Sequence, residues 1–226
     1  MTVTVTSAAS SRKLTTLSEV KDDLGISVST FDTAINKKID QASAMIVSFC
    51  GREFAKETVS ETMPGTGDYT LIFTRTPVIS ITSITYKGTT VDANVYELHD
   101  RDAGTVFNST RWLDTALGAS PLSFVPLAQS RENNYTAAYI AGYWLPSFSG
   151  SPSGTDILLP DDIELAAREL AKMLYLGRRR DQSVKQESVT NVGSVTYFGG
   201  ESSGGIGGGI PPMIKDMLSP WRRFVL

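Results

Sequence analysis

A serine within a glycine-rich segment matches a catalytic pattern. Gly200-Glu201-Ser202-Ser203-Gly204 fits the G-x-S-x-G sequence of serine hydrolases. In that class the serine occupies a tight strand-to-helix turn, and the histidine of the triad follows it along the chain. Here the surrounding segment, Gly199–Gly209, is too rich in glycine to hold one shape unaided, and the single histidine, His99, lies far upstream. A flexible linker is the favoured interpretation, and a hydrolase based on Ser202 is the weakest hypothesis.

The segment Leu98–Asp102 brings an imidazole and two carboxylates together. A general base needs a partner and a pocket, and a metal needs three or four converging ligands; neither follows from this spacing. A polar loop after a strand is the favoured interpretation. The glycine-rich segment also lacks the Gly-Lys-Ser/Thr of a phosphate-binding loop, and Ile210 occupies the third glycine position of a dinucleotide fingerprint. We therefore expect no catalytic, cofactor-binding or metal-binding residues, and no enzyme.

Composition restricts the remaining function classes. The chain has 226 residues, with 24 acidic and 21 basic side chains and a net charge of −3, which argues against a generally basic nucleic-acid-binding surface. Lone Cys50 excludes an internal disulfide framework. No apolar run is long enough to span a bilayer, and no secretory signal begins the chain. These features predict a protein made in a reducing cytoplasm without a membrane partner.

Periodicity predicts helices at the two ends of the chain. Residues 1–13 are small and polar, which favours a flexible tail or one ordered by a partner. Thr16 and Glu19 form a capping-box pattern ahead of a helix that stops at Gly25. A second helix starts after Thr30 and keeps the 3.6-residue period up to Gly51. A third begins at 159–162, and residues 210–218 are a short helix candidate.

Between these helices the period changes to two. Residues 53–146 therefore predict an inserted antiparallel β subdomain, and residues 147–155 a flexible connector. The strand candidates within it are Thr58–Met63, Tyr69–Thr74, Pro77–Tyr86, Val95–His99, Thr105–Asn108 and Tyr135–Ala141. The expected fold is α+β: a small helical bundle body of three main helices and a short C-terminal helix, over residues 14–52 and 156–226, with extended terminal arms.

Two features suggest binding. Arg178, Arg179 and Arg180 follow the third helix, either as a solvated helix end or facing phosphates or an acidic partner. The C-terminal arm, residues 210–226, places large apolar groups after the glycine-rich segment. Either they fold back onto the helical core, or the arm docks on a neighbouring subunit or another protein, where Trp and Arg are favoured anchors. The candidate binding residues are Ile210, Met213, Ile214, Met217, Leu218, Trp221, Arg222, Arg223, Phe224 and Leu226.

The order of these segments resembles a family, the head-tail connector (adaptor) proteins of tailed bacteriophages. The resemblance covers about residues 14–226, and it lies in the order of the motifs, because each motif alone is a pattern found in many helices and strands. The motifs are Leu17–Leu24, Phe49–Phe54, Thr76–Ile84, Tyr135–Tyr143, Leu159–Ala166, Val184–Phe198 and Leu218–Arg223.

The resemblance implies a structural virion protein at the head-tail junction, synthesised in the bacterial host cytoplasm. Such proteins form a ring, usually twelvefold, that docks on the portal, extends the DNA channel and provides a platform for the next tail or stopper component. The expected partners are portal protein, neighbouring copies and that component, with transient non-specific contact to double-stranded DNA. Under this reading the helical body builds the ring, the arm docks on the portal or an adjacent subunit, and Arg178–Arg180 are the channel candidates.

Two alternatives stay open beside it. The chain could be a DNA-binding module that uses a local basic patch, or the Ser202 or His99 hydrolase. For the connector hypothesis, we expect deletion of residues 210–226 to leave a folded subunit that fails to join the particle. Unfolding of that variant would instead place the arm in the core.

Overall fold

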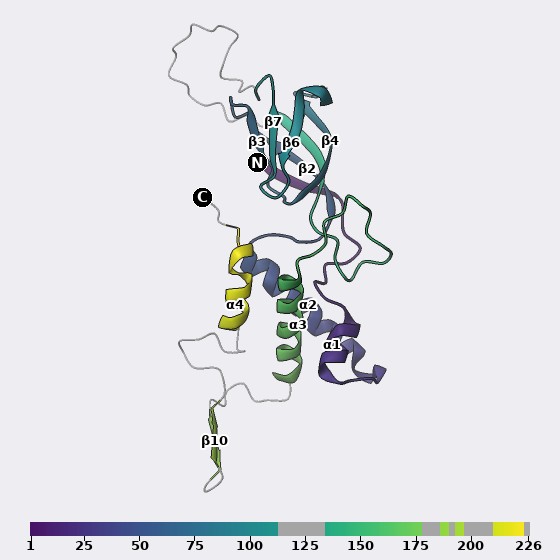
Figure 1. The fold of residues 1–226 in the computed structure, drawn as a ribbon, viewed down its shortest axis with the longest axis vertical. Coiled ribbons are helices and arrows are strands. Elements are labelled where there is room, and N and C mark those ends of the chain that lie inside the picture. Colours follow the sequence, from purple (N-terminus) through teal and green to yellow (C-terminus); the bar gives the residue numbers. More distant parts are fainter. Residues whose placement is uncertain (113–133, 178–185, 190–192, 197–209, 224–226) are drawn as a thin grey trace. The chain divides into compact units, whose positions relative to one another are not determined.

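The structure, a computed structural model, describes residues 1–112, 134–177, 186–189, 193–196 and 210–223 (Figure 1). The chain divides into two compact units. The β unit contains Met1–Ser10, Ala55–Trp144 and Ser151–Leu158, and the helical unit contains Ser11–Phe54, Leu145–Gly150 and Leu159–Leu226. Helices and antiparallel sheets are both present, so the expected α+β class is confirmed.

The β unit contains two antiparallel sheets. The five-stranded sheet has the order β1-β2-β8-β4-β5, and the three-stranded sheet has the order β3-β7-β6. The strands are β1 (Thr2–Ser7), β2 (Glu57–Met63), β3 (Thr70–Ile72), β4 (Val78–Tyr86), β5 (Thr89–Thr90), β6 (Tyr96–Asp100), β7 (Thr105–Asn108) and β8 (Tyr135–Ala141). A short 3-10 turn, Ala93–Val95, precedes β6. The expected strands all form, with shifts of one or two residues at some ends.

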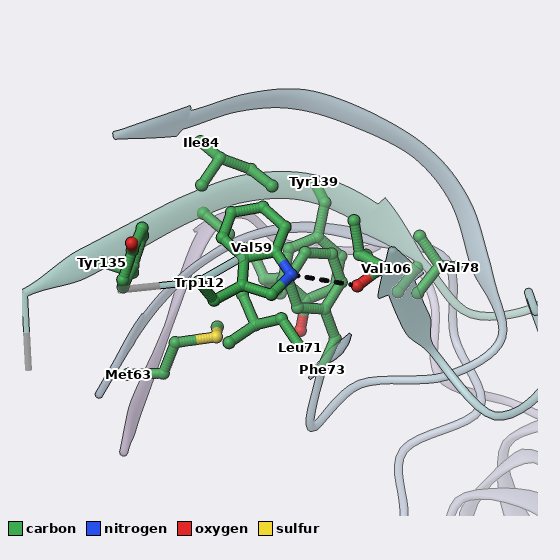
Figure 2. Packing of buried hydrophobic residues seen from close by; sticks show 12 residues of the cluster. Val59, Met63, Leu71, Phe73, Val78, Ile84, Val106, Trp112, Tyr135 and Tyr139 are labelled. Carbon is green, nitrogen blue, oxygen red and sulfur yellow. Dashed lines mark hydrogen bonds between the residues drawn. The ribbon is translucent and has the colours of Figure 1, made fainter. Parts of the chain in front are cut away.

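Alternation along the strands builds the core of the β unit. Every second residue of β2 and β8 is buried, as expected for strands with one covered face. Inward side chains of both sheets meet in one cluster, with Trp112 packed among them (Figure 2). The Trp112 indole Nε1 donates a hydrogen bond to the Val106 carbonyl at 3.2 Å, so this fully buried polar atom has an acceptor. Edge-to-face packing against Tyr135, at 5.4 Å between ring centroids, adds to the contact.

The other face of the five-stranded sheet is hydroxylic. Thr2, Thr62, Thr136 and Thr85 lie in register across four strands. The Thr85 hydroxyl donates to the Thr136 carbonyl at 3.2 Å. This row accounts for the serine and threonine content of the strands, because one face of an antiparallel sheet can stay in contact with water.

The N-terminal segment differs from its expectation. Residues 2–7, expected to lie in a flexible tail, form β1 and pair with β2. Val3 and Val5 turn inward and pack against the core of the β unit. Alternating threonine and valine is a strand pattern with high β-propensity, and the partial burial of the two valines offsets the entropy of ordering the segment.

The helical unit is built from α1 (Leu17–Leu24), α2 (Asp32–Cys50), α3 (Asp161–Leu176) and α4 (Pro212–Leu218). Short 3-10 turns, Ser29–Phe31 and Ser219–Trp221, precede α2 and follow α4. The Thr16 hydroxyl accepts from the Glu19 amide at 3.3 Å, as the capping pattern predicts, whereas the Glu19 carboxylate accepts from the Thr15 hydroxyl. Gly51 ends α2 in the left-handed conformation, at a φ of 65°, which glycine adopts without steric cost.

Residues 147–155, expected to be a flexible connector, make specific hydrogen bonds: the Ser147 hydroxyl donates to the Lys13 carbonyl at 2.7 Å, and the Asp156 carboxylate accepts from the Ser153 amide at 2.9 Å. β9 (Gln186–Val189) and β10 (Gly193–Thr196) form a hairpin within the expected segment Val184–Phe198.

Candidate interaction surfaces

The loop after β6 has no catalytic arrangement in the described residues. The Asp100 carboxylate accepts hydrogen bonds from the backbone amides of Asp102 and Ala103, at 2.8 and 3.0 Å, and so shapes a turn. His99 is exposed on β6. No group of three or more possible metal ligands is found among the described residues, and none of their helices has the length and apolarity to cross a membrane. Ser202 and the glycine-rich segment lie outside the described residues.

The C-terminal segment packs on its own helical unit, because α4 lies against α3. Ile210, Ile214 and Leu218 are at most 5% exposed, so these three expected docking residues belong to the core of the chain. They recur every four residues, and this spacing puts them on one helical face. These three residues were expected to dock on a partner, but they are buried against the subunit's own helices.

The end of the described chain is tied to α2. The Arg223 amide donates to the Cys50 carbonyl at 2.8 Å, which satisfies one of the last carbonyls of that helix. The Arg222 guanidinium carbon lies 4.9 Å from the centre of the Phe49 ring. Burial also raises the pKa of the Cys50 thiol to about 11. This thiol is therefore protonated and unreactive at neutral pH.

Of the other expected docking residues, some remain accessible. Met213 is 58% exposed, Arg222 and Arg223 are exposed, and Met217 and Trp221 are half-buried. Phe224 and Leu226, and the channel candidates Arg178, Arg179 and Arg180, lie outside the described residues. Among the expected docking residues that the structure describes, the exposed ones are thus a methionine on α4 and two arginines that follow the turn after it.

A second surface, which was not expected from the sequence, lies on the three-stranded sheet. Tyr69, Ile72 and Phe107 are 38, 56 and 39% exposed. The rings of Tyr69 and Phe107 stack with centroids 5.9 Å apart, and the Arg111 guanidinium carbon lies 4.8 Å from the Tyr69 centroid. We call these four residues the β3–β7 patch. Aromatic residues and arginine are enriched in protein interfaces, so the patch is a candidate docking surface.

The patch follows from alternation. Thr70 pairs with Phe107 and Leu71 with Val106, so burial of Leu71 and Val106 directs Phe107 and Ile72 outward. The signal was therefore present in the sequence. Predicting the patch, however, requires knowing which residues of β3 and β7 face the core. Strands of three and four residues are too short for their alternation to decide this.

The helical unit also holds a pair of neighbouring carboxyl groups, Glu19 in the first turn of α1 and Glu164 on α3. Burial raises the pKa of the Glu164 carboxyl to about 7, and a hydrogen bond and charge repulsion from Glu19 contribute to this rise. The positive charge of Arg168 lowers the pKa of Glu164, and the negative charge of Asp161 raises it further. Beside this pair, Arg168 and Lys172 of α3 contact the Asp23 carboxylate at 3.0 and 3.1 Å. The packing of α1 on α3 therefore combines ion pairs with one carboxyl that holds its proton near neutral pH.

Replacing Glu164 by glutamine is expected to remove a pH dependence of stability. A raised carboxyl pKa in the folded state stabilises most below the unfolded pKa, and this contribution is lost as pH rises through about 7. Glu164→Gln should therefore raise the free energy of unfolding by about 1 kcal/mol near pH 8, after discounting for partial exposure, and change little near pH 5. Thermal unfolding across this range measures it.

Asp216→Asn, at an exposed position of α4 in the same unit, is the matched control. A parallel shift of the Glu164→Gln curve at all pH values would contradict the assignment.

Residues 13–116 match the family model of the head completion protein. The fold matches the neck of a native gene transfer agent particle computed with C12 symmetry, at a TM-score of 0.56 and 16% identity, over 100% of this chain and 97% of that one. The resemblance to head-tail connector proteins is confirmed.

Two further structures give the same result. The neck of an empty gene transfer agent particle, computed with C6 symmetry, matches with a TM-score of 0.56, 16% identity and the same coverage. The virion of a native gene transfer agent particle matches with a TM-score of 0.54, 18% identity and the same coverage. No curated protein sequence matches the chain. The head completion model ends before β8, whereas the likeness in fold extends over the whole chain, including α3 and α4.

Proposed function

We propose that this chain is a structural protein of the head-tail junction of a tailed phage or a phage-like particle. The observation that carries the proposal is the likeness in fold to neck structures over the whole chain. The match of residues 13–116 to the head completion family supports it independently. The protein would be synthesised in the host cytoplasm and incorporated into the virion.

In this role the chain forms a ring that docks on the portal, extends the DNA channel and supports the next tail or stopper component. Two of the similar neck structures were computed with C12 and C6 symmetry, which supports a ring of twelve copies. The ring is built by the helical unit. Two accessible surfaces serve the partners: the β3–β7 patch, and Met213 with Arg222 and Arg223.

The chain acts through shape and multivalent contact. The loop after β6 is shaped by backbone hydrogen bonds to Asp100, and the Cys50 thiol is buried and protonated. These side chains have structural roles, and the function that the connector resemblance implies requires no catalytic step.

A DNA-binding module is the second candidate function, carried by the arginine triplet. The sequence of the β unit contains ten acidic and six basic side chains, so this unit would repel a duplex. Contact with DNA would therefore involve Arg178–Arg180 and stay non-specific, as a channel that lets DNA slide requires. Binding of a duplex by the isolated chain with a steep salt dependence would favour the module instead.

An assembly assay with purified portal protein of the same particle tests the proposed function. The wild-type chain should co-sediment with portal rings, at a stoichiometry that corresponds to a ring. Chain that stays free at all portal concentrations would contradict the proposal. The chain alone is no test, because a ring that needs the portal as template leaves free subunits monomeric.

A charged substitution in the β3–β7 patch is expected to weaken assembly without unfolding the subunit. Phe107→Asp introduces a charge at a half-exposed position, so the free energy of unfolding should change by less than about 1 kcal/mol. Incorporation into the complete junction should fall at least about tenfold, since an uncompensated interface charge costs more than 1.4 kcal/mol. Pull-down of the portal and the next tail component measures it.

The control for this variant is Thr89→Asp, which adds the same charge at an exposed position of β5. Equal loss of incorporation in both variants would mean that charge in general disturbs assembly, and the β3–β7 patch would not be a docking surface.

A further inference from the structure

The edge strands of the two sheets in the β unit differ in how well they are protected against pairing with a further strand. Within the described sheets, β5 has two residues and β3 has three. β6 carries Glu97, His99 and Asp100 and a register shift. Short strands, charges and bulges are the usual devices that prevent an edge from pairing with another strand.

β1 lacks these devices over its first four residues. It is the end strand of the five-stranded sheet and has the sequence Thr-Val-Thr-Val-Thr-Ser, with no charge and no proline. Its pairing with β2 is regular from Thr2 to Val5, and the register shifts only after Val5. Among the described residues, no strand pairs with the side of β1 away from β2, so this edge of high β-propensity is a template for strand addition.

The same chain contains a hairpin that lacks a third strand. β9 and β10 form a sheet of their own, and within the described elements they join neither of the other two sheets. Two strands of four residues each are marginally stable in water, and a third strand stabilises them.

The sequences of the two hairpin strands indicate which of them is the better edge for pairing with another strand. β10, Gly-Ser-Val-Thr, has no charged residue, whereas β9 carries Glu187. Pairing through β10 would place two uncharged strands together. It would leave β9 as the new edge, where Glu187 opposes further addition.

We propose that β10 of one copy pairs with the free edge of β1 in the adjacent copy. Each copy then offers one edge and one hairpin, so the contact is head-to-tail, the kind that generates closed rings when the rotation closes. The inference rests on the proposed ring, and it identifies the contact between subunits as strand addition from the helical unit of one copy to the β unit of the next.

Disulfide trapping between two single-site variants tests the pairing. Thr4→Cys is made in one preparation, and cysteine is placed in turn at Gly193, Ser194, Val195 and Thr196 in others. Native Cys50 is 1% exposed and contributes little background. Mixed with portal and oxidised, at least one pair should give covalent dimers in assembled rings, at least about tenfold above the unassembled mixture. Thr89→Cys, on β5, replaces Thr4→Cys as the control and should give none.

A second variant replaces residues 186–196 by a short Gly-Ser loop. Because the hairpin joins neither sheet of the β unit, thermal unfolding should stay unchanged, while ring yield on the portal falls at least about tenfold. Normal ring yield without the hairpin would overturn the pairing. If wild-type chain forms no ring, the proposed function fails and the pairing with it; rings without any trapped pair overturn the pairing alone.

Discussion

Removing residues 210–226 is expected to unfold the helical unit and leave the β unit folded. Ile210, Ile214 and Leu218 are buried beneath α4. Each contributes about 2 kcal/mol by burial, so the loss of all three approaches the total stability of an ordinary domain. The sequence alone predicts a folded subunit after this deletion, whereas the packing of α4 on α3 predicts that the helical unit unfolds.

The measurement can separate the two units. The deletion removes Trp221, and the two tryptophans that remain, Trp112 and Trp144, lie in the β unit. Tryptophan fluorescence should therefore stay native while far-UV circular dichroism loses helical signal. Native helical content in the truncated chain would contradict the assignment.

Point substitutions give a finer version of the same test. Ile214→Ala should lower the free energy of unfolding by about 2–4 kcal/mol, because it opens a cavity under α4. Met213→Ala, its exposed neighbour, should change the stability by less than about 0.5 kcal/mol. Reduced portal binding by Met213→Ala would then indicate docking by the outer face of the helix rather than damage to the fold.

Replacing Glu61 by alanine is expected to give the second largest effect, loss of about 3 kcal/mol or more from the β unit. Glu61 lies fully buried on β2. Its carboxylate accepts from the Tyr139 hydroxyl at 2.6 Å and from the Thr74 amide at 2.9 Å, and the Thr74 hydroxyl also contacts it. Burial and the neighbouring Glu61 carboxylate raise the pKa of Tyr139, which keeps this phenol a donor.

The loss arises from donors left without an acceptor. Without Glu61 the Tyr139 hydroxyl and the Thr74 amide lose the group that ties the segment after β3 to β8. Glu61→Gln keeps one carbonyl acceptor and should cost less. Glu97→Ala, at an exposed position of β6, should change the stability by less than about 0.5 kcal/mol. Urea unfolding followed by tryptophan fluorescence measures all three. Equal stability of Glu61→Ala and Glu97→Ala would show that the buried carboxylate does not hold this segment.

Much of the fold could be predicted from local pattern. The Thr16 cap, the Gly51 stop and the alternation of β2 and β8 act within a few residues, so the helices and strands are visible in the sequence. Long-range pairing is not local. The partner of β1 is β2, more than fifty residues away, and only that pairing turns a polar tail into a strand.

The candidate surfaces could be predicted less well than the elements. An apolar stripe such as Ile210, Ile214 and Leu218 has the same pattern whether it covers its own core or a neighbour, and only the packing of α4 decides between them. From the sequence alone, Glu61 is expected to be a solvated residue of a half-exposed strand; only the fold places the Tyr139 hydroxyl of β8 where it donates to the Glu61 carboxylate. The β3–β7 patch required the inward residue of two very short strands.

Electron cryomicroscopy of the chain bound to its portal tests the central claim most directly. The account predicts a closed ring of copies seated against the portal around an open channel, with the β unit and helical unit of each copy recognisable. A portal whose lower surface stays bare, with this chain found as separate single copies or on another part of the particle, would contradict it.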